Sequence, residues 1–389
     1  MRMAQARSAR KSNVQSLVER LEGRQLLSAS VDQFSQTNLV SDLPATAAHQ
    51  DPQLLNPWGV AFAPNQEFWV SDNGAGVTTL YDGAGVKQSL VVNIPGAGGQ
   101  SASPTGQVFN GTSGFVVTKG NASGAAAFIF AGEDGGISAW SPSVDLQNAV
   151  LEFDGTAAPG GAVYKGLAIG NIKKSTFLYA ANFRSGNIDV FDSSFKEVNL
   201  KNAFHDKKIP AGFAPFNVQN LNGQIAVTYA KQNAAKHDDV AGAGNGFVDI
   251  FSTSGRLVRR LKHGSFLNSP WGLAIAPKSF DKLAGDILVG NFGSGQIDAF
   301  SRSGNFITTL KDTSNNPITI NGLWALTPGS GGMGSSTQSI YFTAGINEEQ
   351  DGLFGQLDFS KVVKIKSAKS PGQSPSPAPS PTPNPYPAG

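Results

Sequence analysis

The chain has 389 residues, and its 30 Lys and Arg against 28 Asp and Glu leave a net charge of +2, too small for a basic nucleic-acid-binding surface to be its main function. It has no cysteine, which excludes disulfides, thiolate metal sites and a cysteine nucleophile. It contains no run of 18 apolar residues, so no membrane-spanning helix is predicted. Its 46 Gly, 25 Phe and 15% charged residues are typical of an all-β protein with many tight turns.

The first segment, residues 1–30, lacks the apolar core of an ordinary secretory signal. Its residues 21–27 read Leu-Glu-Gly-Arg-Gln-Leu-Leu. This run resembles the Leu-Glu-Pro-Arg-x-Leu-Leu motif found near the N-termini of exported and surface proteins of planctomycete-type bacteria, with Gly23 in place of the proline. We expect an export or targeting segment here. The alternative is a short amphipathic helix, because Val14, Leu17, Val18 and Leu21 recur at helical spacing.

A repeated unit fills the middle of the chain. Each copy opens on a Pro-Trp-Gly-like triplet, continues through two strands of which the second ends in Asn or Asp, and then passes a glycine turn into a third strand. The clearest copies open at Pro57 and Pro270. All six openings, near residues 57, 104, 165, 215, 270 and 321, are spaced by roughly 47 to 61 residues, which suits four-stranded propeller blades.

This period predicts a six-bladed β-propeller of the NHL/TolB-like type over residues 31–366. The residues from Phe34 to Val40 precede the first opening, and we expect them to supply an outer strand to the last blade so that no sheet edge is left exposed. The rival all-β fold, a long sandwich, would not need the period. Trp58, Trp271 and Trp324 recur at equivalent openings, where packing in the core is favoured over ligand stacking.

The last segment, residues 367–389, has proline at nearly every second position among Ser, Thr, Ala and Asn. Such a composition favours extended polyproline conformation and cannot form a core. We expect a disordered tail. It would either space the propeller from a cell envelope or be an inert terminus.

Several motifs of the repeat resemble those of an uncharacterised bacterial family of NHL-like six-bladed propellers. The similarity covers about residues 37 to 360, and its motifs include residues 70–74, 270–274, 288–293, 321–324 and 341–345. It implies the propeller fold and an envelope location, and no activity. The wider six-bladed group includes gluconolactonase-like calcium hydrolases, quinone-dependent sugar dehydrogenases and binding modules. The lactonase-like enzymes have a glutamate in the first inner strand, whereas the first inner strand here, Trp58 to Phe62, has no carboxylate.

The loops that lead into the inner strands, and those that join the second and third strands, meet at one rim of a propeller channel. We therefore expect any ligand site to lie at this rim. Polar side chains are frequent in these loops. The predicted ligand-binding residues are Asn56, Asp72, Asn73, Asn182, Arg184, Asn291, Asn321 and Glu348.

Two runs of residues carry candidate chemistry. His237, Asp238 and Asp239 form an acid–base candidate, since a carboxylate can orient a neighbouring imidazole; the alternative is a solvated loop. Asn347, Glu349 and Asp351 fall at positions 1, 3 and 5 of an EF-hand-like loop, and oxygen ligands suit Ca²⁺. The flanks of that loop read as strands, so a solvated loop is again the alternative.

Other catalytic motifs are absent from the sequence. The remaining histidines stand singly, and no Gly-x-Ser-x-Gly occurs, which excludes the usual zinc-hydrolase and serine-esterase patterns. The leading hypothesis is a monomeric, secreted or cell-surface binding or scaffold module for an envelope protein or glycan, without nucleic-acid binding. The alternative is a divalent-metal-dependent hydrolase or lactonase, with Ca²⁺ as the metal and its site at the channel mouth.

Overall fold

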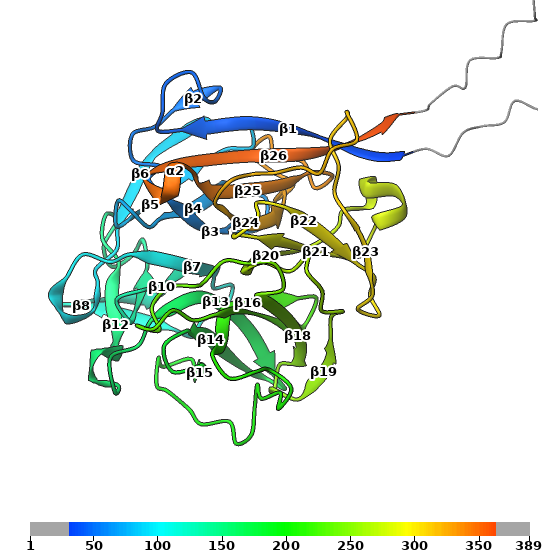
Figure 1. The fold of residues 1–389 in the computed structure, drawn as a ribbon. Coiled ribbons are helices and arrows are strands. Elements are labelled where there is room, and N and C mark those ends of the chain that lie inside the picture. Colours follow the sequence, from blue (N-terminus) through cyan, green and yellow to red (C-terminus); the bar gives the residue numbers. More distant parts are fainter. Residues whose placement is uncertain (1–30, 363–389) are drawn as a thin grey trace, which may run out of the picture. The chain divides into compact units, whose positions relative to one another are not determined.

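The computed structural model describes residues 31–362, and residues 32–360 form one compact unit. This unit is a six-bladed β-propeller (Figure 1), which confirms the predicted fold. Among the described residues there is no helix long and apolar enough to cross a membrane. The predicted export segment 1–30 and the proline-rich tail 367–389 lie outside the described residues.

The six innermost strands contact one another in a closed ring, in the order β3, β7, β13, β16, β20, β24 and back to β3. Each of them is the innermost strand of one sheet, and the sheets are numbered as blades 1 to 6 in this order. Within the described part of the chain, blade 3 has three strands. From the channel outward, blade 1 consists of β3 (Pro57–Ala61), β4 (Phe68–Asp72), β5 (Val77–Tyr81) and β6 (Lys87–Asn93), and blade 2 of β7 (Pro104–Phe109), β10 (Phe128–Gly132), β11 (Gly136–Trp140) and β12 (Val150–Asp154). Blade 3 consists of β13 (Tyr164–Ile172), β14 (Ser175–Asn182) and β15 (Asn187–Phe191), and blade 4 of β16 (Phe213–Leu221), β17 (Gln224–Lys231), β18 (Gly246–Ser252) and β19 (Leu257–Arg260). Blade 5 consists of β20 (Pro270–Ile275), β21 (Ile287–Asn291), β22 (Ile297–Phe300) and β23 (Phe306–Thr309), and blade 6 of β24 (Leu323–Pro328), β25 (Ile340–Gly345), β26 (Asp351–Val362), β1 (Val31–Ser41) and β2 (His49–Gln50).

The remaining elements are short. They are the hairpin of β8 (Val116–Lys119) and β9 (Ala122–Ala125), the 3-10 turns η1 (Ala97–Gly99), η2 (Gly155–Ala157) and η3 (Lys278–Leu283), and the single turn α2 (Ile346–Glu349).

The last blade is closed by the N-terminal strand. Strand β1 lies beside β26 (Figure 1), so the predicted outer strand for the last blade is confirmed. Ser41 Oγ donates a hydrogen bond of 2.7 Å to the Gly352 carbonyl at one end of the pair, and the Phe34 and Phe359 rings meet at 5.6 Å near the other. Two ends of the described chain therefore share one sheet, which leaves the ring of blades without a gap.

Every inner strand is irregular at the same point of the repeat. The register of the inner strand with its neighbour shifts after its first residue or near the equivalent position in all six blades. The first residue left out of the regular pairing in each blade is Trp58, Thr105, Lys165, Phe216, Trp271 or Trp324; Phe216 is the fourth residue of its strand, and the others are the second. Because a bulge re-aims side chains, this irregularity suits a position that faces the channel.

Aromatic rings from the neighbouring blades 5, 6 and 1 pack against one another in the channel. The Trp58 and Trp324 rings stack with centroids 3.5 Å apart, and Trp271 meets both of them edge-on at 6.0 and 5.8 Å. All three tryptophans are buried, in one cluster with Phe216. The structure thus places them in the core, as the packing interpretation expected, where each contributes on the order of 3 kcal/mol of burial.

Candidate ligand site at the channel mouth

Lys165 is the one charged residue among the six channel-facing positions. Its side chain is 2% exposed, and its ammonium lies 5.2 Å from the centroid of the Trp58 ring. The ammonium pairs with Glu133 Oε1 and lies 3.5 Å from Asp238 Oδ1. A buried ammonium is stable only when paired in this way, so Lys165 and its two carboxylates form one unit.

From this unit a chain of hydrogen bonds runs around the channel mouth. Asn73 Nδ2 donates to Glu133 Oε2 at 2.9 Å. Asn56 Nδ2 donates to Glu349 Oε2 at 2.9 Å and lies 3.4 Å from Asn73 Oδ1. Asn56 Oδ1 in turn accepts the Trp324 indole N–H at 3.0 Å, which ties the mouth to the aromatic layer beneath it.

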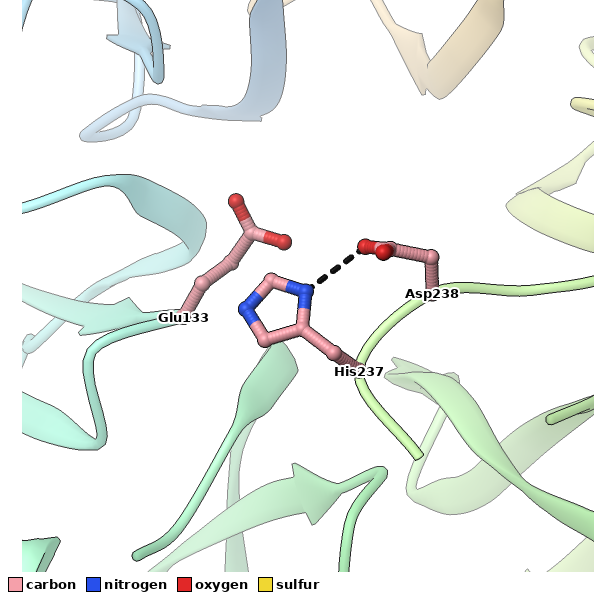
Figure 2. A group of neighbouring side chains, drawn as sticks. All are labelled: Glu133, His237 and Asp238. Carbon is pink, nitrogen blue, oxygen red and sulfur yellow. Dashed lines mark hydrogen bonds and ion pairs between the residues drawn. The ribbon is translucent and has the colours of Figure 1, made fainter. Parts of the chain in front are cut away.

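The histidine of the site stands at the other end of this chain. Figure 2 shows Glu133, His237 and Asp238 turned toward one another, with His237 Nδ1 2.7 Å from Asp238 Oδ1. Although burial raises it, the pKa of Asp238 is held below its usual range by the hydrogen bond from His237 and by the Lys165 ammonium. A neutral imidazole that donates from Nδ1 keeps a lone pair on Nε2, so His237 can accept a proton or a hydrogen bond there.

Carboxylates outnumber cations at the mouth. Burial raises the pKa of Glu349, and repulsion by Glu133 and Asp239 adds to the effect, against the opposing Asn56 hydrogen bond and Lys165 charge. Burial also raises the pKa of Asp239, although the Ser269 hydroxyl and Lys165 oppose it. Four carboxylates thus share a single lysine, which disfavours an anionic ligand.

Glu349 is held at the mouth by strained backbone. Asn347, Glu348 and Glu349 have φ values of 53°, 57° and 65°, in the left-handed region that favours glycine. Such a conformation costs about 1 to 2 kcal/mol per residue, and strain of this kind concentrates at functional sites. The turn α2 therefore presents the Glu349 carboxylate at the expense of local stability.

The space beside the cluster is an open depression of about 420 Å³. Its lining includes Glu133, His237, Arg184 and Gly160. A second cavity, of about 220 Å³, is lined by the later residues of the inner strands and has no charged side chain in its lining. Of these two cavities, only the one at the end of the channel where the inner strands begin is therefore lined by charged side chains.

The predicted rim residues fall into two groups. Asn56 and Asn73 belong to the mouth network described above. Asp72, Asn182 and Asn291 are instead buried inside their blades, where they bond to the residue seven positions later: Thr79 at 2.7 Å, Asp189 at 2.8 Å and Asp298 at 2.9 Å, respectively. This repeated pair braces the turn between the second and third strands.

The remaining predicted residues lie at the periphery. Arg184 lines the open depression and donates to the Gly160 carbonyl, while Asn321 and Glu348 are exposed. In the predicted calcium loop, Asn347 Nδ2 bonds to Asp351 Oδ2 at 2.8 Å, whereas Glu349 turns away to Asn56. The structure therefore joins Glu349 to the mouth and leaves Asn347 with Asp351.

Two central residues of the site, Glu133 and Lys165, were not predicted from the sequence. Lys165 opens the third repeat, at the position that Trp58 and Trp271 occupy in theirs. Glu133 lies in the turn after the second strand of blade 2, as Asn73 does in blade 1. In an alignment of the six repeats, each of these two positions has a charged residue in one repeat only.

The chain has relatives of clear similarity. It is 32% identical over 330 residues to "Uncharacterized protein R648" of Acanthamoeba polyphaga mimivirus, covering 84% of this chain and 80% of the viral protein. It is 32% identical over 331 residues to "Uncharacterized protein L690" of the same virus, covering 84% and 86% of the two chains. The chain belongs to the family of these viral proteins. No protein-family model matches it.

The solved structures that resemble the chain are distant. A streptogramin B lyase is 11% identical with a TM-score of 0.47, covering 85% of this chain and 98% of the lyase. The apo-form of a soluble aldose sugar dehydrogenase from Escherichia coli is 11% identical with a TM-score of 0.48, covering 84% and 99%. Values this low carry no inference about the activity of this chain.

The resemblance to a bacterial family was wrong, because these relatives are viral. The motifs behind it, such as Val70 to Gly74, are strand and turn residues that blade geometry requires, and they carry no information about the source of a chain. The comparisons also provide no support for a planctomycete-type motif at residues 21–27, which lie outside the described residues.

The pairing of Lys165 with Glu133 can be tested by a double-mutant cycle. Lys165→Met leaves Glu133 without its cation at a site where only 14% of the carboxylate side chain is exposed, which should cost about 3 kcal/mol or more in the free energy of unfolding. Adding Glu133→Gln removes the orphaned charge and should restore most of that loss. Urea denaturation measures all four proteins. Single effects that simply add in the double variant would contradict the pairing.

The raised pKa of Glu349 predicts a pH-dependent effect of Glu349→Gln. A raised folded-state pKa gives stability that is present below the ordinary pKa of Glu and is lost as pH rises through the folded-state value. The variant cannot ionise, so it should gain stability relative to the wild type as pH rises. Chemical denaturation from pH 4 to pH 8 tests this, with Glu67→Gln, in the turn between β3 and β4, as the reference. The same pH dependence in both variants would refute it.

Proposed function

We propose that the protein is a binding β-propeller whose channel mouth takes a neutral, polyhydroxylated ligand such as a segment of a glycan. The observation that carries this proposal is the continuous network from Glu349 through Asn56, Asn73, Glu133 and Lys165 to Asp238. These side chains come from five of the six blades, so the site depends on the whole ring.

The acceptors left over at the mouth suit hydroxyl groups. Glu349 Oε1 and His237 Nε2 make no hydrogen bond within residues 31–362. Each can accept from a ligand hydroxyl, while the excess of carboxylates disfavours phosphates and uronic acids. Polar groups held rigidly around an opening are typical of orientation-specific binding sites.

An oligosaccharide array tests this function. Wild-type protein should bind a subset of neutral oligosaccharides and reject those that carry uronic acids. Glu349→Gln removes one charged acceptor and should weaken binding about tenfold, the effect expected for a hydrogen bond to a charged group. Glu67→Gln, the same chemical change in the β3–β4 turn, should bind as the wild type does. Binding of no neutral oligosaccharide, or equal binding by both variants, would refute the proposal.

A second candidate function is a divalent-metal-dependent hydrolase. Glu133, His237 and Asp238 each offer one donor atom, and these atoms lie within 4.8 Å of one another (Figure 2). The Lys165 ammonium pairs with two of the three, so a metal ion would have to displace it. With an ion held by these three residues, the metal would polarise a substrate carbonyl or activate a bound water.

Metal content decides this second candidate. The candidate predicts one divalent ion per chain by mass spectrometry of protein purified without chelator, and a fall in Tm after EDTA. Calcium and zinc should bind more tightly to Lys165→Met than to the wild type, because the competing ammonium is gone. Absence of bound metal together with an unchanged Tm would reject the hydrolase.

The binding proposal does not depend on where the protein resides. The secreted or cell-surface location stays a prediction from the sequence, and the mouth network would bind the same ligand in any compartment.

A further inference from the structure

An aspartate recurs at one position of the third strand in three successive blades. It is Asp189 in Ile-Asp-Val-Phe of blade 3, Asp249 in Val-Asp-Ile-Phe of blade 4 and Asp298 in Ile-Asp-Ala-Phe of blade 5. Burial raises the pKa of all three. A partly buried carboxylate needs hydrogen-bond donors, so each blade must supply them.

In blades 4 and 5 the outer strand supplies the donor. Arg260 on β19 lies directly opposite Asp249 and binds it through both oxygens, at 2.8 and 3.2 Å. Thr309 on β23 lies directly opposite Asp298 and donates its hydroxyl at 2.7 Å. The fourth strand of the blade thus completes the coordination of the aspartate.

Among residues 31–362, blade 3 has no fourth strand. Asp189 Oδ2 accepts from Asn182 at 2.8 Å and from Tyr164 at 3.1 Å, and within the described residues no hydrogen bond reaches Oδ1. The chain after β15 pairs only at its end, through a bridge of Phe191 with Glu197 and the bond from Val198 N to the Val190 carbonyl. It then leaves the edge, so the stretch from Asn187 to Asp189 has no outer strand.

A cavity of about 330 Å³ lies beside this edge of β15. It is lined by residues 186–190 on one side and by residues from 197 to 205 on the other. Glu197 is close enough to Asp189 that, after burial, repulsion from Asp189 further raises the pKa of Glu197. No cation among the described residues forms an ion pair with either carboxylate.

We propose that the open edge of blade 3 docks an extended segment of a protein partner, which places an arginine on Asp189 and Glu197 and completes the blade as a fourth strand. An unpaired strand edge offers backbone hydrogen bonds to an added strand. The two carboxylates provide the charge complementarity, and Arg260 in blade 4 shows the geometry that the arginine would adopt. This inference is independent of the channel mouth.

The chain itself provides the probe. A synthetic peptide of residues 256–262, Arg-Leu-Val-Arg-Arg-Leu-Lys, copies the strand that completes blade 4. Fluorescence anisotropy should show that it binds the full chain, and hydrogen exchange at residues 187–190 should slow on binding. Citrulline in place of the arginine that corresponds to Arg260 keeps the shape and removes the charge, and it should weaken binding tenfold or more.

Two variants of the protein complete the experiment. Asp189→Asn keeps an acceptor for Asn182 and Tyr164 and should also lose tenfold or more in affinity. Asp298→Asn changes the equivalent residue of a blade whose outer strand is present, and it should bind the peptide as the wild type does.

Three outcomes would overturn the proposal. They are no binding of the peptide, equal binding of the citrulline peptide by the wild type, and binding of free arginine amide as tight as that of the peptide. The last result would mean that the backbone edge contributes nothing and that the cavity is a site for small cations. The citrulline comparison uses only wild-type protein, so it decides the matter even if a variant fails to fold.

Discussion

The whole structure depends on the filling of the central channel. Six inner strands that contact one another in a ring leave a hole on the axis, and an unfilled hole would forfeit the contacts of every residue that lines it. The stacked Trp58 and Trp324, with Trp271 against both, close it from three different blades. Strand β1 completes the last sheet, so all six blades can pack around that aromatic layer.

The candidate site arises where this layer is interrupted. At the equivalent position of blade 3 the chain has Lys165, whose buried ammonium must be paired and therefore requires Glu133 and Asp238 from the neighbouring blades. Asn56 links the carboxylate of Glu349 to the indole of Trp324, which makes the aromatic floor and the polar mouth one structure. The residues that hold the ring together thus also position the groups that face a ligand.

Both proposed binding sites are departures from the repeat. The mouth depends on a lysine at a position where three of the other blades have tryptophan. The blade 3 edge is open because, within the described residues, this blade lacks the outer strand that the other five blades have. In a repeat protein the regular positions are set by packing between blades, so a position that departs from them is free to serve a ligand. The turn from Asn347 to Glu349 is a further departure, because all three residues have left-handed backbone. This backbone strain lowers the stability of the protein at the place where binding is proposed.

The sequence by itself determined the all-β class, the six blades, the closing strand around Phe34 and the packing position of the tryptophans, because each follows from a local pattern repeated at a fixed period. It also located Asn56, Asn73 and the His237–Asp238 pair in loops that reach one rim. Only the tertiary structure decided which polar residues meet. By their place in the repeat, Asp72, Asn182 and Asn291 were predicted to lie at the rim, yet each is buried and hydrogen-bonded to a residue of its own blade. Glu133 and Lys165, 32 residues apart, form the centre of the site. The physical reason is that spacing along a strand specifies a residue's face and depth, while a partner in another blade is set by the closure of the ring.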